Sequence, residues 1–208
     1  VDMLFGFLTP NAGTVTMQSE NLLGLSQQKL RDKGVALIPE DRMLYGIAGS
    51  ASIEENLISD RSAEKRLNHG PLFNMKAIHD EADKLIEDYA VLCKSRKQQV
   101  GMLSGGNIQK VVVAREFSGN PVLILADQPT RGIDVGAKYE IYELILQLAK
   151  QGKAVMMVSS EMPELIGICD RILVMSNGHM AGILERGKDF GGIENEQETI
   201  MRLAAQYV

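Results

Sequence analysis

The residues best suited to chemistry form a short run, Leu103-Ser104-Gly105-Gly106-Asn107, where a stretch with helical periodicity begins. A serine followed by two glycines at a helix N-terminus leaves several backbone amides free and adds a hydroxyl donor. Because glycine has no side chain, a phosphate group can approach those amides closely. The same run also fits an ordinary serine N-cap followed by flexible glycines, and the run alone does not separate the two interpretations.

A carboxylate follows about twenty residues downstream, where the apolar run from Val122 to Ala126 ends in Asp127. Strands built of apolar residues are typical of a parallel sheet that is covered on both faces. Ligands of such sheets bind at the carboxyl ends of the strands, where Ser159 and Ser160 are also expected. Asp127 in this place predicts a ligand of Mg²⁺ beside nucleotide phosphates, although a lone aspartate there is more often a turn former or a cap. Asp134 is placed to cap the next helix.

Alternating strands and helices are predicted to position these residues. The expected elements, in chain order, are strands at 14–18 and 35–38 in one small sheet, a helical insertion at about 51–101, a strand at 122–126, a helix with Ile141, Leu144, Ile145 and Leu148 on one face that is ended by Gly152, a strand at 154–158, a strand at 171–175 that returns through a hairpin to 184, and a helix at about 196–206. This order predicts an α/β fold with a parallel core sheet, an inserted helical subdomain and a small antiparallel β part. We expect one domain over 1–208, with a C-terminal hairpin and helix at about 171–208.

Composition narrows the possible partners. The 208 residues carry a net charge of −5, and their lysines and arginines are scattered, so no basic footprint for nucleic acid is present. Cys93 and Cys169 lie far apart, which predicts reduced, buried thiols of a cytoplasmic protein. No apolar run approaches the roughly 20 residues that span a bilayer. The apolar segment from Val1 to Leu8 has no helix cap before it and is interpreted as the tail of an interrupted helix.

Taken together, the motifs resemble the ATP-binding cassette (ABC) family. The signature motif LSGGQ is present as LSGGN at 103–107, the Walker B strand as VLILAD at 122–127, and the D-loop as RGID at 131–134. The resemblance covers almost the whole chain. More narrowly, IPEDR at 38–42, PTRGIDVGAK at 129–138, SSEMPEL at 159–165 and DRILVMSNG at 170–178 resemble the C-terminal cassette of bacterial ribose- and galactose-type importers.

This resemblance implies a P-loop NTPase-like ATPase that uses ATP and Mg²⁺ to drive monosaccharide import. It implies a cytoplasmic subunit at the inner face of the bacterial membrane, paired with a second cassette, with membrane permeases and, indirectly, with a periplasmic sugar-binding protein. Nucleic acid is not an expected partner. By the same resemblance, the signature residues close over ATP held by the partner cassette, Asp127 binds Mg²⁺, and two further residues join the nucleotide site; these cofactor-binding residues are Ser104, Gly105, Gly106, Asn107, Asp134 and Glu40.

The sequence departs from the family pattern at several positions. No G-x-x-x-x-G-K-S/T loop is present, and the near match at 182–189 ends in Asp189, so we expect that the N-terminal strand and the P-loop are missing and that residues 1–8 continue a missing helix. Gln128 stands at the catalytic glutamate, Glu40 at the Q-loop glutamine and Ser160 at the switch histidine. We therefore expect weak local hydrolysis and an inactive isolated chain, although a glutamine can still orient water.

Some residues and functions keep two interpretations. Glu40 and Arg42 form either an exposed ion pair within a turn or a coupling element. Glu161 and Glu164 are interpreted as first-turn helix charges. Alternatives to a sugar-import ATPase are a degenerate, non-catalytic regulatory cassette and a non-transport ABC protein of DNA repair or translation. Nucleosides and a sugar-like autoinducer are alternative substrates.

Overall fold

The computed structural model describes residues 1–207 of the chain. The chain divides into two compact units, the first spanning Val1–Val158 and the second beginning at Ser159. Each unit has its own apolar core. Among the helices of the described residues, none combines the length and the apolar character that crossing a membrane requires.

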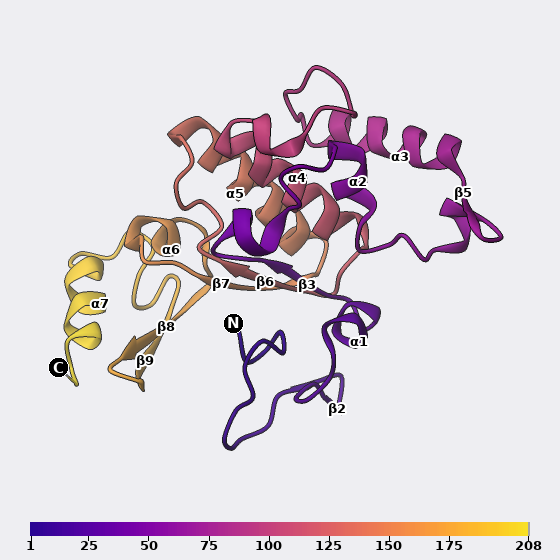
Figure 1. Cartoon of the computed structure of the whole chain (residues 1–208). Coiled ribbons are helices and arrows are strands. Elements are labelled where there is room, and N and C mark those ends of the chain that lie inside the picture. The colour runs from indigo at the N-terminus through magenta and orange to yellow at the C-terminus, as the bar shows by residue number, and fades with distance from the viewer. Residues whose placement is uncertain (208) are drawn as a thin grey trace. The chain divides into compact units, whose positions relative to one another are not determined.

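A parallel sheet of three strands forms the centre of the first unit. Its strands are β3 (Val35–Ile38), β6 (Leu123–Asp127) and β7 (Ala154–Val158), in the order β3-β6-β7. Leu37 lies opposite Leu125, and Leu125 lies opposite Met156. The predicted α/β fold with a parallel core sheet is confirmed (Figure 1).

Alternation along the strands divides their side chains between the two faces of the sheet. Ala36 and Ile38 pack against the helical side, whereas Val35 and Leu37 pack against the N-terminal segment. Both faces of β3 and β6 are therefore covered, as predicted. On β7 the covering is incomplete, because Met156 and Val158 are 42% and 38% exposed.

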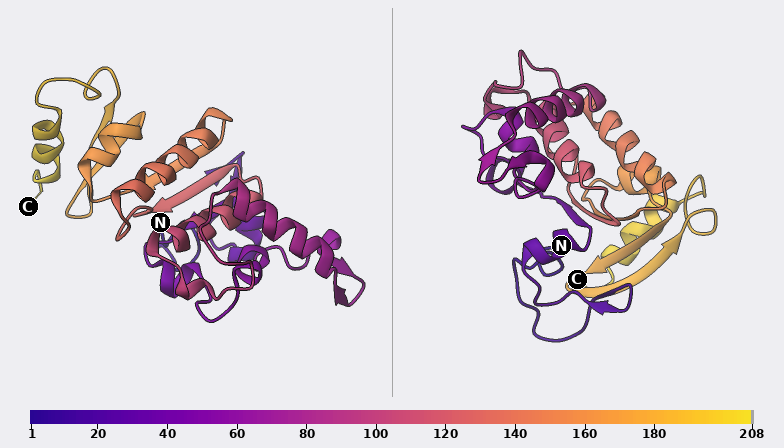
Figure 2. Two further views of the ribbon diagram at one scale, coloured as in Figure 1. Left: turned by 90° about the horizontal axis from the view of Figure 1, so that it is seen from above. Right: turned by 90° about the vertical axis from the view of Figure 1, so that its right-hand side faces the viewer.

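Helices cover one face, and the N-terminal segment covers the other. The helices are α2 (Ile53–Ile58), α3 (Met75–Asp88), α4 (Gly105–Ser118) and α5 (Val135–Lys150). The indigo segment with α1 (Gln27–Asp32) runs on the opposite side of the sheet (Figure 1 and the right-hand view of Figure 2). Helix α4 is buried almost all round, because it lies between the sheet and its neighbouring helices.

The N-terminal residues do not form the predicted helix tail. Residues 1–8 make successive turns, in which the Phe5 amide donates to the Val1 carbonyl at 3.0 Å and the Phe7 amide donates to the Asp2 carbonyl at 2.8 Å. Gly6 has φ +79°, which interrupts a right-handed helix. The turns bring Phe5, only 2% exposed, onto the second face of the sheet.

The two early strands do not share one sheet, so that prediction was wrong. Strand β1 (Thr16–Met17) pairs with β2 (Glu20–Asn21) in a tight hairpin. Gln18 and Ser19 both have positive φ at the turn, which matches the twist of such hairpins. Strand β3 instead joins the core sheet, because all four of its residues are buried there.

The insertion is largely helical, as predicted. It contains α2, a 3₁₀ turn η2 (Lys65–Leu67), α3, and, after a loop, a second 3₁₀ turn η3 (Val100–Met102). Helix α3 buries Ile78, Ala82 and Leu85, in agreement with their spacing. The prediction missed the short hairpin of β4 (Asn68–His69) and β5 (Leu72–Phe73), and the π-helical turn η1 (Arg42–Gly46) that precedes the insertion.

The second unit contains α6 (Met162–Ile168), the hairpin of β8 (Arg171–Ser176) and β9 (His179–Glu185), and α7 (Glu196–Ala204). Asn177 and Gly178 both have positive φ at the predicted turn, so the hairpin is confirmed. Its inward face packs against α7 through Ile200. Both cysteines are free and only half-buried, one against the core of each unit, which corrects the prediction of buried thiols.

Candidate functional site

Helix α4 begins at the Ser-Gly-Gly run. Ser104 is the N-cap, and its Oγ accepts hydrogen bonds from the Asn107 amide at 3.4 Å and from Asn107 Nδ2 at 2.9 Å. Asn107 Oδ1 in turn accepts from the Leu92 amide at 2.7 Å, so this side chain ties the helix start to the loop after α3. Ser104 itself is exposed. The run is thus a true helix N-terminus with a hydroxyl at its solvent-facing end.

The two glycines are required by close packing. A Cβ atom on Gly106 would lie 2.7 Å from the Cβ of Ala137 in α5. A Cβ atom on Gly105 would lie 3.0 Å from Arg42 Nη2 and 3.3 Å from the Gly132 carbonyl oxygen. Residues 104–107, which we call the signature tip, therefore sit directly against the loop that follows β6.

That loop begins with a residue in an unusual backbone conformation. Asp127 is the last residue of β6, and Gln128 follows in the left-handed region at φ +48°. A non-glycine residue there costs on the order of 1 kcal/mol and persists only where the surroundings enforce it. The Gln128 amide donates to the Val158 carbonyl at 2.8 Å, which fixes the turn against β7. Asp134 caps α5 by accepting from the Ala137 amide at 3.0 Å, as predicted.

Negative charge gathers around Asp127. Burial raises the pKa of Asp127, the N-terminal ammonium lowers it, and the carboxylates of Glu40 and Asp2 raise it further. A bound cation would relieve this repulsion. Residues 1–207 contain no group of three or more His, Cys, Asp or Glu side chains arranged for a metal. A single carboxylate nevertheless fits Mg²⁺, which is often held by one or two carboxylates together with water and substrate phosphates.

Charged residues after β3 reach the same loop. Glu40 forms an ion pair with Arg131, and Arg42 donates from Nη1 to the Arg131 carbonyl at 2.6 Å and from Nη2 to the Gly132 carbonyl at 3.2 Å. The interpretation of Glu40 and Arg42 as a mutual ion pair is therefore wrong. Parallel neighbours end at the same edge of the sheet, which brings 40–42 beside 128–132.

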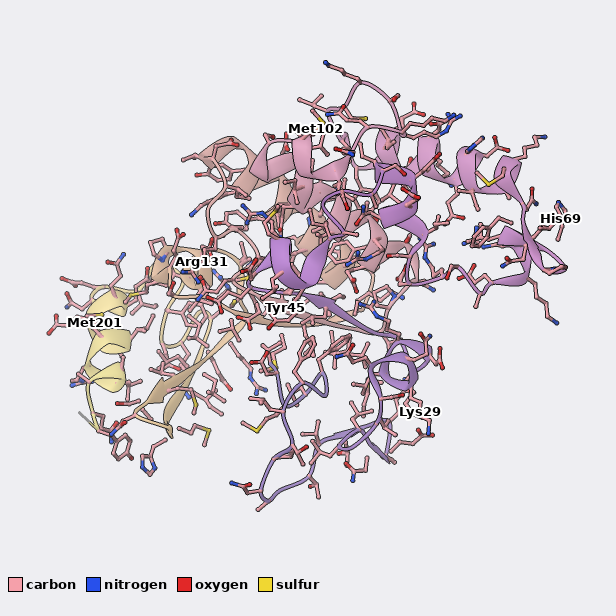
Figure 3. The ribbon with its side chains drawn as sticks, in the orientation of Figure 1. Lys29, Tyr45, His69, Met102, Arg131 and Met201 are labelled. Carbon is pink, nitrogen blue, oxygen red and sulfur yellow. The ribbon has the colours of Figure 1, made fainter. Side chains whose placement is uncertain are left out.

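The contacts of Arg42 and Arg131 were missed by the sequence reasoning. The signal that points to them is a set of opposite charges placed directly after the carboxyl ends of two apolar strands. Figure 3 labels Arg131 in the loop after β6, Tyr45 in η1 and Met102 just before the signature tip.

Ser160 belongs to the second unit, where it is exposed between Ser159 and Glu161. Ser159 Oγ donates to the carboxylate of Glu164 and accepts from the Glu161 amide at 2.9 Å. Glu164 lies in the first turn of α6, which confirms its interpretation as a first-turn charge, whereas Glu161 is the N-cap residue just before that turn. The other predicted site residues all belong to the first unit.

Comparison with known proteins places this geometry in a family. The model of the ABC transporter family matches residues 1–131. The chain belongs to the ABC transporter family. The resemblance of the sequence motifs to ABC cassettes is thereby confirmed.

Relatives of this ABC transporter chain match it over its whole length. A galactose/methyl galactoside import ATP-binding protein of Mannheimia succiniciproducens is 44% identical over 209 residues, and one of Treponema denticola is 40% identical over 209 residues. The alignments cover 100% of this chain and 40% of each relative. The chain therefore spans well under half the length of these relatives.

Solved structures share the fold. An ATP-binding cassette of an ABC transporter in its ADP conformation matches with a TM-score of 0.69 at 18% identity, covering 98% of this chain and 77% of that one. A dimeric cassette in a post-hydrolysis state, bound to ADP and phosphate, matches with a TM-score of 0.71 at 21% identity, covering 89% and 79%.

Proposed function

We propose that this chain is the ATPase cassette of a monosaccharide importer and that its signature tip contacts ATP held by a partner cassette. The observation that carries the proposal is the exposed Ser104 hydroxyl at the N-terminus of α4. The relatives are galactose/methyl galactoside import ATP-binding proteins, which supports the substrate class.

The chemistry of the tip suits a phosphate. The first amides of a helix have no partner within the helix, and the aligned peptide dipoles place partial positive charge at the same end. A γ-phosphate can accept from these amides and from the Ser104 hydroxyl. Each such donor contributes on the order of a few kcal/mol when the transition state forms in a closed site. Because Asn107 is bonded to Ser104 and Leu92, its part is to orient the serine as well as to contact the nucleotide.

The chain's own half-site has weaker chemistry. Asp127 would supply a ligand to Mg²⁺, which neutralises phosphate charge when it is bound. Gln128 can orient water but cannot accept its proton, and Glu40 is engaged by Arg131. Ser160 stands where the family has its switch histidine and lacks a ring nitrogen that could accept a proton. Asp134 contributes by holding the start of α5 beside Gly106.

The assembly implied by this function includes a second cassette and membrane permeases supplied by a periplasmic sugar-binding protein. The cassette would then work at the cytoplasmic face of the bacterial membrane. Residues 51–101 would act as the helical subdomain of the cassette, and residues 171–208 as its C-terminal hairpin and helix. An isolated chain, without the partner's phosphate loop, would hydrolyse ATP very slowly.

A serine variant tests the proposal. Ser104→Ala removes one donor to the γ-phosphate, so ATP turnover by the assembled complex should fall by roughly 10² to 10³-fold. Ser26→Ala is the matched control, because Ser26 caps α1 through the same 3.4 Å contact to an amide, that of Lys29. Both variants lose a cap contact of the same length, but Ser104→Ala also loses the 2.9 Å hydrogen bond from Asn107 Nδ2, so its loss of stability should be the larger.

The readout is steady-state phosphate release by the complex at saturating ATP. Turnover in Ser104→Ala that equals turnover in Ser26→Ala would show that the signature tip does not contact the reacting phosphate. Gly105→Asp is a poorer test, because its side chain would also displace Arg42 within the chain itself.

A non-catalytic regulatory cassette is the second candidate, favoured by Gln128 at the position of the catalytic glutamate. Under that function this chain's own half-site binds nucleotide only weakly and does not hydrolyse it. Single-turnover measurements that resolve one hydrolysed ATP per pair of cassettes would support it, and two would exclude it.

A further inference from the structure

Arg42 is the first residue of η1, and Glu40 lies in the short segment that joins β3 to η1. Its guanidinium is half-buried, and burial lowers the pKa of Arg42 while Asp41 partly restores it. Its Nε atom is buried and has no hydrogen-bond partner in the described part of the chain. Placing a charge there is unfavourable, so the contacts of its two terminal nitrogens must offset that burial.

Both hydrogen bonds of the Arg42 guanidinium go to the loop that follows β6. Nη1 and Nη2 donate to the successive carbonyls of Arg131 and Gly132, at 2.6 and 3.2 Å. A planar guanidinium can bridge two adjacent acceptors in a fixed orientation, which a lysine ammonium does less well. A Cβ atom added to Gly105 would lie 3.0 Å from the same Nη2 atom. Arg42 therefore lies between the loop after β6 and the signature tip.

Glu40 strengthens the same connection from the other side. Its ion pair with Arg131 joins the segment after β3 to the loop whose carbonyls accept hydrogen bonds from Arg42. The pair is exposed and contributes little alone. With the two carbonyl contacts it forms a clasp, which we define as Glu40, Arg42 and Arg131.

We propose that Arg42 is a positioning residue that holds residues 129–134 against the signature tip, so that the end of β3, the loop after β6 and the start of α4 behave as one body. The proposal rests on the proposed function only in that this body would face the partner's ATP. Its consequence is that a displacement of the segment after β3 would be transmitted through Arg42 to the signature tip.

Hydrogen–deuterium exchange of the full-length protein without nucleotide tests the clasp. Arg42→Ala should raise amide exchange in residues 129–134 and 103–107 by at least about tenfold, because two hydrogen bonds to a charged donor are lost from a local opening equilibrium. Arg42→Lys should give a smaller rise in exchange, since one ammonium replaces the two guanidinium nitrogens that donate to the two carbonyls. Arg66→Ala is the control: Arg66 is an exposed arginine paired with Glu64 and Glu81, and its loss should leave both segments unchanged.

Unchanged exchange of 129–134 in Arg42→Ala would overturn the proposal. A uniform rise over the whole first unit would also overturn it, because that result describes a general loss of stability. The kinetic counterpart is a fall in kcat of about tenfold with KM for ATP little changed, since the partner's loop binds the nucleotide. Exchange is measured without ATP, so a localised rise stands even if Ser104→Ala leaves turnover intact and the proposed function fails.

Discussion

Glycine at positions 105 and 106 has two physical explanations that act together. The absence of a side chain lets a phosphate approach the amides of the helix start. It also lets α4 approach the start of α5 more closely than a Cβ on Gly106 would tolerate, and it lets the Arg42 guanidinium lie against Gly105. The packing explanation makes a prediction about stability that needs no nucleotide.

Gly106→Ala should lower the free energy of unfolding by about 1–3 kcal/mol, because the new Cβ would meet Ala137 Cβ at 2.7 Å. This loss opposes the helix propensity of alanine, which by itself would add up to about 1 kcal/mol. Gly167→Ala in α6 is the control, because its Cβ meets nothing within 4 Å and only the propensity gain remains. Urea unfolding of both variants measures the difference, and a Gly106→Ala protein as stable as the parent would refute the packing argument.

Helix α4 is held at its far end by a buried carboxylate. The Glu116 side chain is fully buried and accepts from both terminal nitrogens of Arg31, at 2.7 and 3.0 Å, and from Arg115. It also accepts at 3.1 Å from the amide of Leu37 on the edge strand β3. Burial raises the pKa of Glu116, but the arginines and the Leu37 amide outweigh burial, and the net pKa is lowered from its ordinary value. One side chain thus fixes α4 on β3 and α1.

Glu116→Gln should lower the free energy of unfolding at pH 7 by about 3–5 kcal/mol, because it leaves the buried Arg115 and the half-buried Arg31 without their carboxylate. A lowered folded-state pKa gives stability that is present above the unfolded value of about 4.3 and is lost as pH falls through the folded pKa. The difference between parent and variant should therefore shrink below about pH 4.5. Glu20→Gln, which breaks the exposed pair with Lys33, should change stability by less than about 1 kcal/mol.

Denaturant unfolding from pH 7 down to pH 3 provides the measurement. A Glu116→Gln difference that stays constant across this range would mean that the pKa of Glu116 does not change on folding. It would also remove the electrostatic explanation of how α4 is anchored.

Elements with strong local signals could be predicted from the sequence. The apolar strands 35–38 and 122–126, the cap at Asp134 and the Asn177-Gly178 hairpin each have a local physical cause, and each was found. The sheet to which β3 belongs could not be predicted from its neighbouring residues, because its pairing with β6 joins residues about ninety positions apart. The turns at residues 1–8 depend on Gly6 and on burial of Phe5, and an apolar run alone resembles a helix.

Over the whole molecule, the first unit supports a site built from distant segments. Its parallel sheet ends at one edge, where the segment after β3, the loop after β6 and the start of α4 meet. The sequence motifs identified all three segments, yet they did not give the partners of Glu40 and Arg42, since those partners follow from tertiary placement. Roles of Ser104, Asp127 and Gln128 toward a nucleotide remain predictions that only the loaded assembly can test.

The most direct measurement is a structure of the assembled complex trapped with ADP and a γ-phosphate mimic. We predict that Ser104 Oγ and the amides at the start of α4 lie within about 3 Å of the mimic, which the partner cassette holds on its phosphate loop. The contrary result would be a bound mimic whose oxygens contact only the partner, with the signature tip open to solvent.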